Sequence, residues 1–167
     1  DPELRGMGTT LTALLLHEDR IALMHIGDSR AYRIRGAAID QLSVDHTVMQ
    51  ELLSAGTITQ ADVAEHPQRY MLTQALLGSQ ALSIVLHIFD VKDGDRFILC
   101  SDGLSGVLTD KEIKTLVKSQ SPKNAVTALI DATYINGAPD NVTIIVADIA
   151  DGAPAKSAIE FFGTAAP

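Results

Sequence analysis

The chain has 167 residues, 46% hydrophobic and 20% charged, which is ordinary for a globular domain with one sizeable core. Its 21 acidic and 13 basic side chains give a net charge of −8, which disfavours nonspecific binding to nucleic acid. No apolar run is long enough to span a membrane, and no signal peptide is recognisable. The single cysteine, Cys100, cannot form an intrachain disulfide. We therefore expect a cytoplasmic protein with no membrane contact in this chain.

The first quarter of the sequence is typical of antiparallel strands joined by short turns. β-Branched and apolar residues predict strands at 11–16, 21–26, 30–35 and 39–43, the first two forming a hairpin. The third strand mixes apolar residues with Arg30, Arg33 and Arg35, which indicates one solvated face. We interpret Arg30 and Arg33 as solvated strand residues rather than as phosphate binders.

The pattern then changes to a helical period. Thr47 and Gln50 have the spacing of a capping box, and Gly56 stands where that helix would end. A second short helix begins near Thr59 and must end before Pro67. We also assign residues 71–77 to a helix, which makes the whole segment a small helical insertion between two sets of strands.

The second half begins with strands and continues with helices. Strands are predicted within 81–91, at 96–100 and at 142–146, with a turn at Ser101-Asp102-Gly103. Between the last two strands, Thr109 and Ser121 each cap a helix, and Val126, Leu129, Ile130 and Thr133 form the inward stripe of the second one. Runs of strands and runs of helices indicate an α+β fold with largely antiparallel sheets.

Three aspartates stand at corresponding places on these strands. Asp28 and Asp102 each follow a predicted strand, and Asp140 precedes one; each adjoins a glycine or a proline. Strand ends from one sheet or from facing sheets can meet in space. Carboxylates without histidine or cysteine partners favour hard cations such as Mg²⁺, Mn²⁺ or Ca²⁺, and metal held in this way suits chemistry on phosphates.

Six motifs in order across residues 7–149 resemble those of the metal-dependent protein phosphatases of type 2C, and most closely their bacterial serine/threonine branch. They are Met7-Gly8-Thr9-Thr10, His25-Ile26-Gly27-Asp28-Ser29-Arg30-Ala31-Tyr32, Leu42-Ser43-Val44-Asp45-His46-Thr47, His66-Pro67-Gln68-Arg69 with Leu72-Thr73-Gln74-Ala75-Leu76, Gly94-Asp95-Arg96-Phe97-Ile98-Leu99-Cys100-Ser101-Asp102-Gly103-Leu104, and Pro139-Asp140-Asn141-Val142-Thr143. Each motif alone is weak, but their combination in this order is specific.

The resemblance implies a four-layer αββα sandwich of two mainly antiparallel sheets flanked by helices, with a dinuclear Mn²⁺ or Mg²⁺ centre between the sheet edges. Carried over by motif, Asp102 and Asp140 would bind the second metal of the pair, and Asp28, with Asp102, a third and weaker one. The implied reaction is hydrolysis of phosphoserine and phosphothreonine proteins by metal-activated water, without a phosphoenzyme. The implied partners are a phosphoprotein substrate and a cognate serine/threonine kinase.

One part of the family pattern is missing. The family's early Asp-Gly-x-Gly-Gly stretch, which supplies the aspartate that bridges both metals, has no counterpart among these 167 residues. We therefore expect residues 1–150 to be a phosphatase domain lacking its N-terminal segment, with a flap-like helical insertion at 44–78 and a flexible tail at 151–167. The alternative is a catalytically inert relative that acts as a binding or regulatory module. Loss of early strands would also expose sheet edges beside 11–16 or 142–146, which predicts dimerisation, strand exchange or aggregation.

Overall fold

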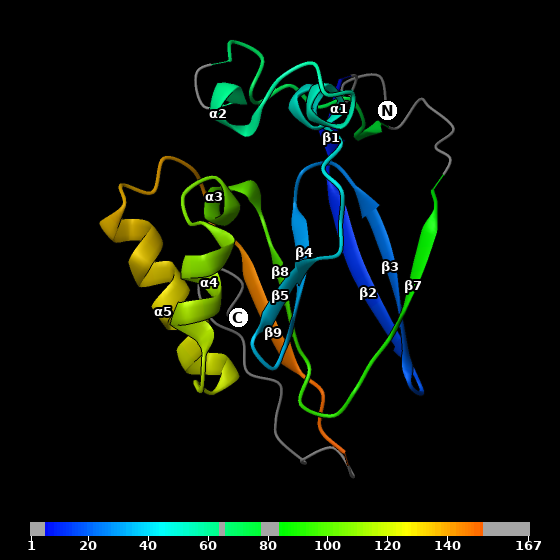
Figure 1. The fold of residues 1–167 in the computed structure, drawn as a ribbon, viewed down its shortest axis with the longest axis vertical. Helices are drawn as coiled ribbons and strands as arrows, with labels where there is room; N and C mark the ends of the chain where they lie inside the picture. Colours follow the sequence, from blue (N-terminus) through cyan, green and yellow to red (C-terminus); the bar gives the residue numbers. More distant parts are fainter. Residues whose placement is uncertain (1–5, 64–65, 78–83, 152–167) are drawn as a thin grey trace.

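Two antiparallel sheets stacked face to face form the body of the molecule in the computed structural model, which describes residues 6–63, 66–77 and 84–151 (Figure 1). The first sheet has the order β2-β3-β7, with β2 at Leu11–His17, β3 at Arg20–Ile26 and β7 at Leu86–Asp90. The second has the order β5-β4-β8-β9, with β5 at Ala38–Gln41, β4 at Arg30–Arg35, β8 at Arg96–Cys100 and β9 at Ile144–Asp148. The predicted hairpin and α+β class are confirmed.

Helices cover the outer face of the four-stranded sheet. They are α3 (Asp102–Ser105), α4 (Asp110–Val117) and α5 (Pro122–Ile135). The cluster between this layer and the sheet includes Tyr32, Ile98, Leu104, Ile113 and Leu129, each with no exposed surface. Burial of these side chains is the main force that holds the helices on the sheet.

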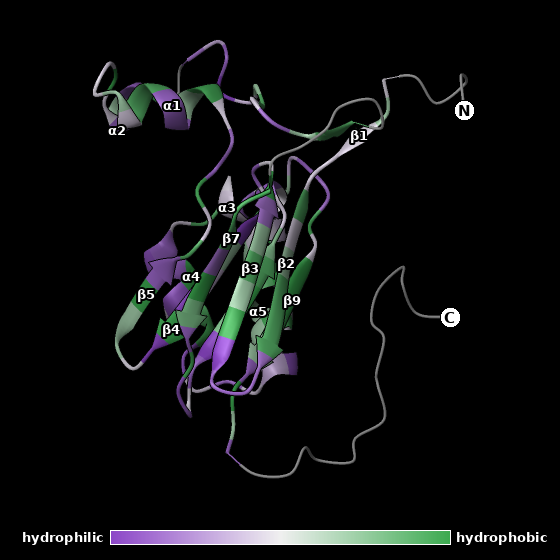
Figure 2. Cartoon of the chain, turned by 90° about the vertical axis from the view of Figure 1, so that its right-hand side faces the viewer, coloured by the Kyte–Doolittle hydropathy of each residue, from purple (hydrophilic) through white to green (hydrophobic). Residues whose placement is uncertain are grey.

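The outer face of the three-stranded sheet differs. Within the described ranges no helix lies against it (Figure 1). Leu15, Leu86 and Ile88 point to this face and are 69%, 56% and 62% exposed. Figure 2 looks onto this side of the molecule and shows hydrophobic colouring along β2 and parts of β3.

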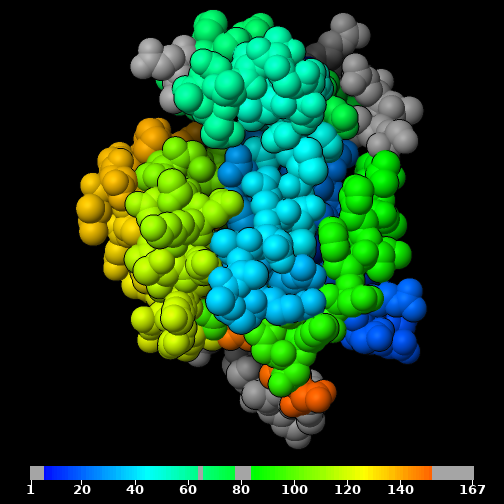
Figure 3. Space-filling model, in the orientation of Figure 1, coloured from blue at the N-terminus to red at the C-terminus, as the bar shows by residue number. Residues whose placement is uncertain are grey.

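The insertion forms a separate small structure over one end of the sandwich, as Figure 3 shows. It contains α1 (Val48–Ser54) and α2 (Gln60–Val63), as predicted, and Thr47 caps α1 by accepting a hydrogen bond from the Gln50 amide. The predicted helix at 71–77 is wrong. Leu72 bridges to Thr47, and β6 (Leu76–Leu77) pairs with β1 (Gly8–Thr9), so pairing with distant backbone decides the conformation of this segment.

The predicted solvated face of the third strand is also wrong. Strand alternation places Arg33 and Arg35 on the same face as Ala31, whose side chain is buried between the sheets. Arg33 donates to Asp40 at 2.7 Å, and Arg35 forms two bonds of 2.6 Å to Asp95, a fully buried carboxylate. Charged residues can occupy this inner face because each guanidinium has an acidic partner.

In the described part of the chain, no helix is long and apolar enough to cross a membrane. The predicted tail falls almost wholly on residues 152–167, and the start of the predicted strand at 81–91 falls on residues 81–83; both lie outside the described residues.

Candidate metal centre

Asp28 lies in a tight bend directly after β3, where the chain passes from the first sheet to the second. Gly27 has a φ of +106°, a conformation that side chains rarely adopt, and a Cβ there would overlap the side chain of Thr10. Glycine is therefore required immediately before the carboxylate. The resulting turn leaves Asp28 half-buried at the end of the sandwich.

Polar groups of β2 and of the residue preceding it hold this bend from one side. The Thr10 hydroxyl lies 3.0 Å from the Ser29 hydroxyl, and the Thr12 hydroxyl donates to the Ser29 carbonyl at 2.8 Å. Thr12 has one hydroxyl proton, which is used in that bond, so it accepts from His25 Nδ1–H at 2.9 Å. These bonds give Thr10, the last residue of the Met7–Thr10 motif, and Thr12, which lies two residues after it, a structural role in fixing the Asp28 loop.

Asp102 lies at the corresponding end of β8 and is the first residue of α3. The sequence predicts a turn here, and the structure shows a short helix that begins at Asp102, with Ser101 as its N-cap residue. A side chain at Gly103 would collide with the backbone carbonyl of Asn141, so the segment after Asp140 packs directly on this turn. Hydrogen bonds of 3.0 Å from Ser101 N to the Thr143 carbonyl and from Thr143 N to Ser101 Oγ fix that contact.

The negative charge of Asp102 acts on Asp28. Burial raises the pKa of Asp28, and the negative charge of Asp102 raises it further. Asp28 precedes Arg30 by two residues and Asp102 follows Cys100 by two, and Arg30 pairs with Cys100, so both carboxylates lie at the same end of the sandwich. A bound cation there would relieve the repulsion that Asp28 experiences. This is the electrostatic arrangement expected of ligands for a hard divalent metal ion.

Asp140 is exposed and does not complete a three-ligand cluster with the other two. Its Oδ1 accepts from the Asn141 amide at 2.7 Å, which orients it at the start of the segment that packs on Gly103. Within the described ranges, no three histidine, cysteine or acidic side chains are grouped closely enough to hold one ion. The donor chemistry fits Mn²⁺ or Mg²⁺, but the described side chains supply too few ligands for a complete site.

Arg30, which the sequence suggests is solvated, instead forms an ion pair beside the site. Its guanidinium donates to both carboxylate oxygens of Asp45 at 2.7 to 3.0 Å and to the hydroxyl of Tyr32 at 3.2 Å. Burial opposes the charge of Arg30, but the bonds to Asp45 outweigh it and raise the pKa of the guanidinium. The sequence pattern does not reveal this pair, although both residues lie in family-like motifs, because the rest of β4 and all of β5 separate the partners along the chain.

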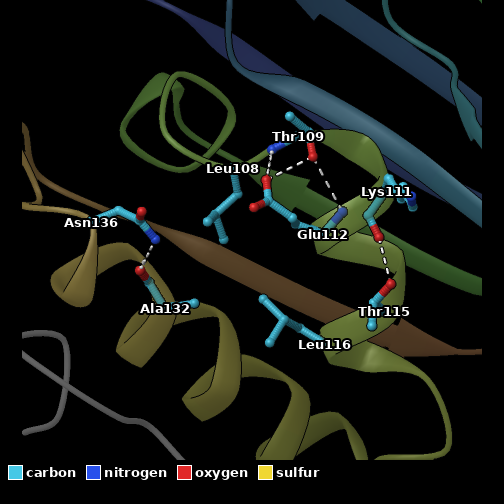
Figure 4. Close-up of a pocket in the computed structure, with 8 residues that line it drawn as sticks. All are labelled: Leu108, Thr109, Lys111, Glu112, Thr115, Leu116, Ala132 and Asn136. Atoms are coloured by element: carbon cyan, nitrogen blue, oxygen red, sulfur yellow. Dashed lines mark hydrogen bonds between the residues drawn. The ribbon is translucent and has the colours of Figure 1, made fainter.

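An open pocket elsewhere on the molecule has no part in this arrangement. It has a volume of about 500 Å³ and lies between α4 and α5, where it is lined by Leu108, Leu116, Ala132 and the capping residues Thr109 and Glu112 (Figure 4). No side chain of the carboxylate site reaches it. The chemistry that the aspartates offer therefore belongs to the exposed sandwich end and not to a deep cavity.

Comparison with known proteins agrees with this architecture. The family model for protein phosphatase 2C matches residues 1–134. The chain is 40% identical to the serine/threonine protein phosphatase PstP of Mycobacterium tuberculosis over 151 residues, and 34% identical to the protein phosphatase PhpP of Streptococcus pneumoniae over 145 residues. These alignments cover 90% and 86% of this chain but 29% of PstP and 59% of PhpP.

Solved structures give the same result. The crystal structure of the M. tuberculosis phosphatase PstP/Ppp matches with a TM-score of 0.85 over 90% of this chain and 63% of that one, at 40% identity. The catalytic domain of PstP in complex with two manganese ions matches with a TM-score of 0.82 at 38% identity, with the same coverage. The chain thus spans less than two thirds of the length of these relatives. Because the family model matches residues 1–134, the chain belongs to the protein phosphatase 2C family.

Proposed function

We propose that this chain is part of a metal-dependent protein phosphatase domain that hydrolyses phosphoserine and phosphothreonine in proteins. The observation that carries the proposal is the placement of Asp28 and Asp102 at one end of the sandwich, each two residues beyond the paired Arg30 and Cys100, in a member of this family. Like charges held together in a fold cost free energy, and a site that binds a divalent cation explains why they are placed there.

Mn²⁺ or Mg²⁺ is the proposed cofactor, and two ions, with a third, are proposed for the complete domain. Asp102 and Asp140 would hold one ion of the pair, and Asp28 would hold the third together with Asp102. When bound, such ions lower the pKa of water and neutralise charge on phosphoryl oxygens. The chain's own part is to hold these carboxylates in place: Gly27 and Ser29 set the position of Asp28, and the Ser101–Thr143 bonds set that of Asp102.

A complete site needs ligands from outside the described residues. The sequence has no Asp-Gly-x-Gly-Gly, and the described side chains form no three-ligand group. We infer that residues 1–150 belong to a domain whose remaining ligands come from a preceding segment. The same two facts favour the second candidate, an inert relative of these phosphatases that acts as a binding or regulatory module.

Hydrolysis of a phosphothreonine peptide separates the two candidates. We would measure it with Mn²⁺ and with a chelator for this chain, and for the same chain preceded by the upstream coding sequence of its gene. Asp102→Asn should lower Mn²⁺-dependent turnover by about a hundredfold or more, because it removes a direct metal ligand. Asp131→Asn, the same change at an exposed position on α5, should have little effect.

Each result has a distinct meaning. Turnover that appears only when the upstream segment is present supports the phosphatase proposal and the need for further ligands. Mn²⁺-dependent turnover by the 167-residue chain alone, lost in Asp102→Asn, supports the phosphatase but contradicts the inferred incompleteness. Absence of turnover from both proteins favours the inert module.

For the partners of this protein we propose a phosphoprotein substrate and a cognate serine/threonine kinase. For its location we propose the cytoplasm. For the isolated chain we also propose association through the outer edges of β2 and β9, each the end strand of its sheet in the described part of the chain.

A further inference from the structure

The two ends of the insertion meet at one narrow crossing, which we call the neck and define as His46–Val48 with Met71–Thr73. Thr47 and Leu72 form an isolated antiparallel bridge. The Val48 amide donates to the Met71 carbonyl at 3.0 Å, and the Thr73 amide donates to the His46 carbonyl at 2.9 Å. The chain therefore enters and leaves the insertion side by side, and whatever holds the neck holds the whole insertion.

The neck is bound directly to the residue before Asp28. The His46 amide donates to the Gly27 carbonyl at 2.8 Å, and the Gly27 amide donates to His46 Nδ1 at 3.2 Å. The His46 ring also packs against that of His25, with 5.0 Å between centroids. Two reciprocal bonds at one glycine connect the insertion to the Asp28 loop without using the Asp28 side chain.

The Arg30–Asp45 ion pair flanks this contact. Arg30 follows the Asp28 loop by one residue and Asp45 precedes His46, so the pair joins the same two segments a short distance from the Gly27–His46 bonds. The carboxylate receives three bonds from the guanidinium and a fourth, of 3.1 Å, from the Gln41 amide. The side chains of Arg30 and Asp45 are 27% and 10% exposed, so the pair is shielded from solvent. Because the guanidinium bonds to both carboxylate oxygens, the pair fixes the orientation of the two side chains as well as the distance between them.

We propose that Arg30 and Asp45 are positioning residues that hold the neck on the Asp28 loop and so keep the insertion and the Asp28 carboxylate in a fixed relation. Neither residue is assigned contact with substrate. The structural part of this inference depends only on the contacts above. Its catalytic consequence, that the insertion stays aligned with the reacting phosphate, rests on the proposed function.

Hydrogen exchange at single amides tests the structural part in the full 167-residue chain. Asp45→Asn should speed exchange at the amides of His46 and Thr73 by about tenfold or more, because loss of the charge-assisted bonds lets the neck open locally. Amides in the centre of the sandwich, such as those of Leu23 and Ile98, should exchange at unchanged rates.

Asp40→Asn is the matched control. It removes the carboxylate from another Arg–Asp pair on β4 and β5, Arg33–Asp40, which has no bond to the neck. Neck exchange should not change in this variant. Equal acceleration at the neck and in the central strands of Asp45→Asn would indicate general destabilisation and overturn the inference, as would unchanged exchange at the neck.

Three further variants test whether the two residues act through each other. Asp45→Glu keeps the carboxylate, so the neck amides should retain most of their protection from exchange. Arg30→Lys keeps the positive charge but cannot form the paired guanidinium–carboxylate hydrogen bonds, so the neck amides should lose protection. The double variant Arg30→Lys/Asp45→Asn should open the neck no more than Asp45→Asn does. Additive effects of the two changes would contradict a shared role.

Peptide hydrolysis then separates this inference from the proposed function. In a hydrolytically active protein, Asp45→Asn should raise KM for a phosphothreonine peptide several-fold more than it lowers kcat, because a loosened insertion weakens alignment of the peptide. Local neck opening in a protein without turnover would support the positioning role and count against the phosphatase. Turnover together with unchanged exchange at the neck amides of Asp45→Asn would support the phosphatase and count against the positioning role.

Discussion

The imidazole of His25 is buried at the end of β3 and forms a single hydrogen bond, through Nδ1. The residue is 8% exposed, and Nε2 is buried without a hydrogen-bond partner among the described residues. Burial lowers the pKa of His25, and the nearby charge of His46 lowers it further, against weaker opposing effects that include the charge of Asp45. The folded protein therefore favours a neutral imidazole here, with the proton on Nδ1 facing Thr12.

This titration gives a pH dependence with a definite sign. Because the pKa of His25 is lower in the folded state than its ordinary value near 6.5, the unfolded chain binds more protons as the pH falls below about 6.5. The contribution of His25 to the free energy of unfolding should therefore decrease from pH 7 to pH 5. Urea unfolding across this range should show a shallower decline for His25→Asn, whose amide can replace Nδ1–H. His17→Asn, at the exposed end of β2, should follow the wild-type curve, and parallel curves for all three proteins would contradict the prediction.

At the scale of elements, local sequence signals predicted those parts whose structure is decided locally. The hairpin of β2 and β3, the capped starts of α1, α4 and α5, and the strand β8 all follow from periodicity and capping residues. The segment at 71–77 could not be predicted in this way because its partners, Thr47 and β1, are distant in sequence. The same limit applies to the site, where motifs located Asp28 and Asp102 but could not show that Arg30 pairs with Asp45.

Helix α5 shows how far periodicity specifies packing. The sequence predicts an inward stripe of Val126, Leu129, Ile130 and Thr133, whereas the fully buried residues are Ala125, Leu129 and Thr133. Leu129→Ala should lower the free energy of unfolding by about 3 kcal/mol, since it leaves a cavity against the four-stranded sheet. Ile130→Ala should cost clearly less, and Ile135→Ala, at an 84% exposed position, close to nothing; urea unfolding of the three variants gives the ranking. Equal losses at Leu129 and Ile130 would favour the stripe predicted from the sequence.

For the molecule as a whole, the sandwich is unevenly covered. β2 and β9 end their sheets on the same side of the sandwich, as Figure 2 shows, and Leu16 and Ile145 on these strands are 50% and 55% exposed. Together with the apolar outer face of the β2-β3-β7 sheet, this leaves backbone edges and hydrophobic side chains available to another chain. In the described part of the chain, exposed apolar side chains such as Leu15, Leu86 and Ile88 thus lie on an uncovered sheet face next to an edge strand.

Light scattering of the isolated 167-residue chain should therefore give a mass above the 17.8 kDa of one chain, rising with concentration. Leu15→Lys on β2 and Ile145→Lys on β9 should shift the distribution towards monomer, because a charged side chain on an edge strand opposes pairing. Asp131→Lys on α5 adds the same side chain away from both edges and should leave association unchanged. A monomer at high concentration for the unmodified chain would rule out association through these surfaces.

The neck also has a consequence for how such proteins can diverge. Because the residues at which the insertion begins and ends are paired with each other in space, its interior can lengthen, shorten or change sequence while the two sheets keep their register. The entropy of closing a loop grows slowly with its length, so such changes carry a small thermodynamic penalty. Evolution can thus change the length and sequence of the insertion without moving the Asp28 loop or the two sheets.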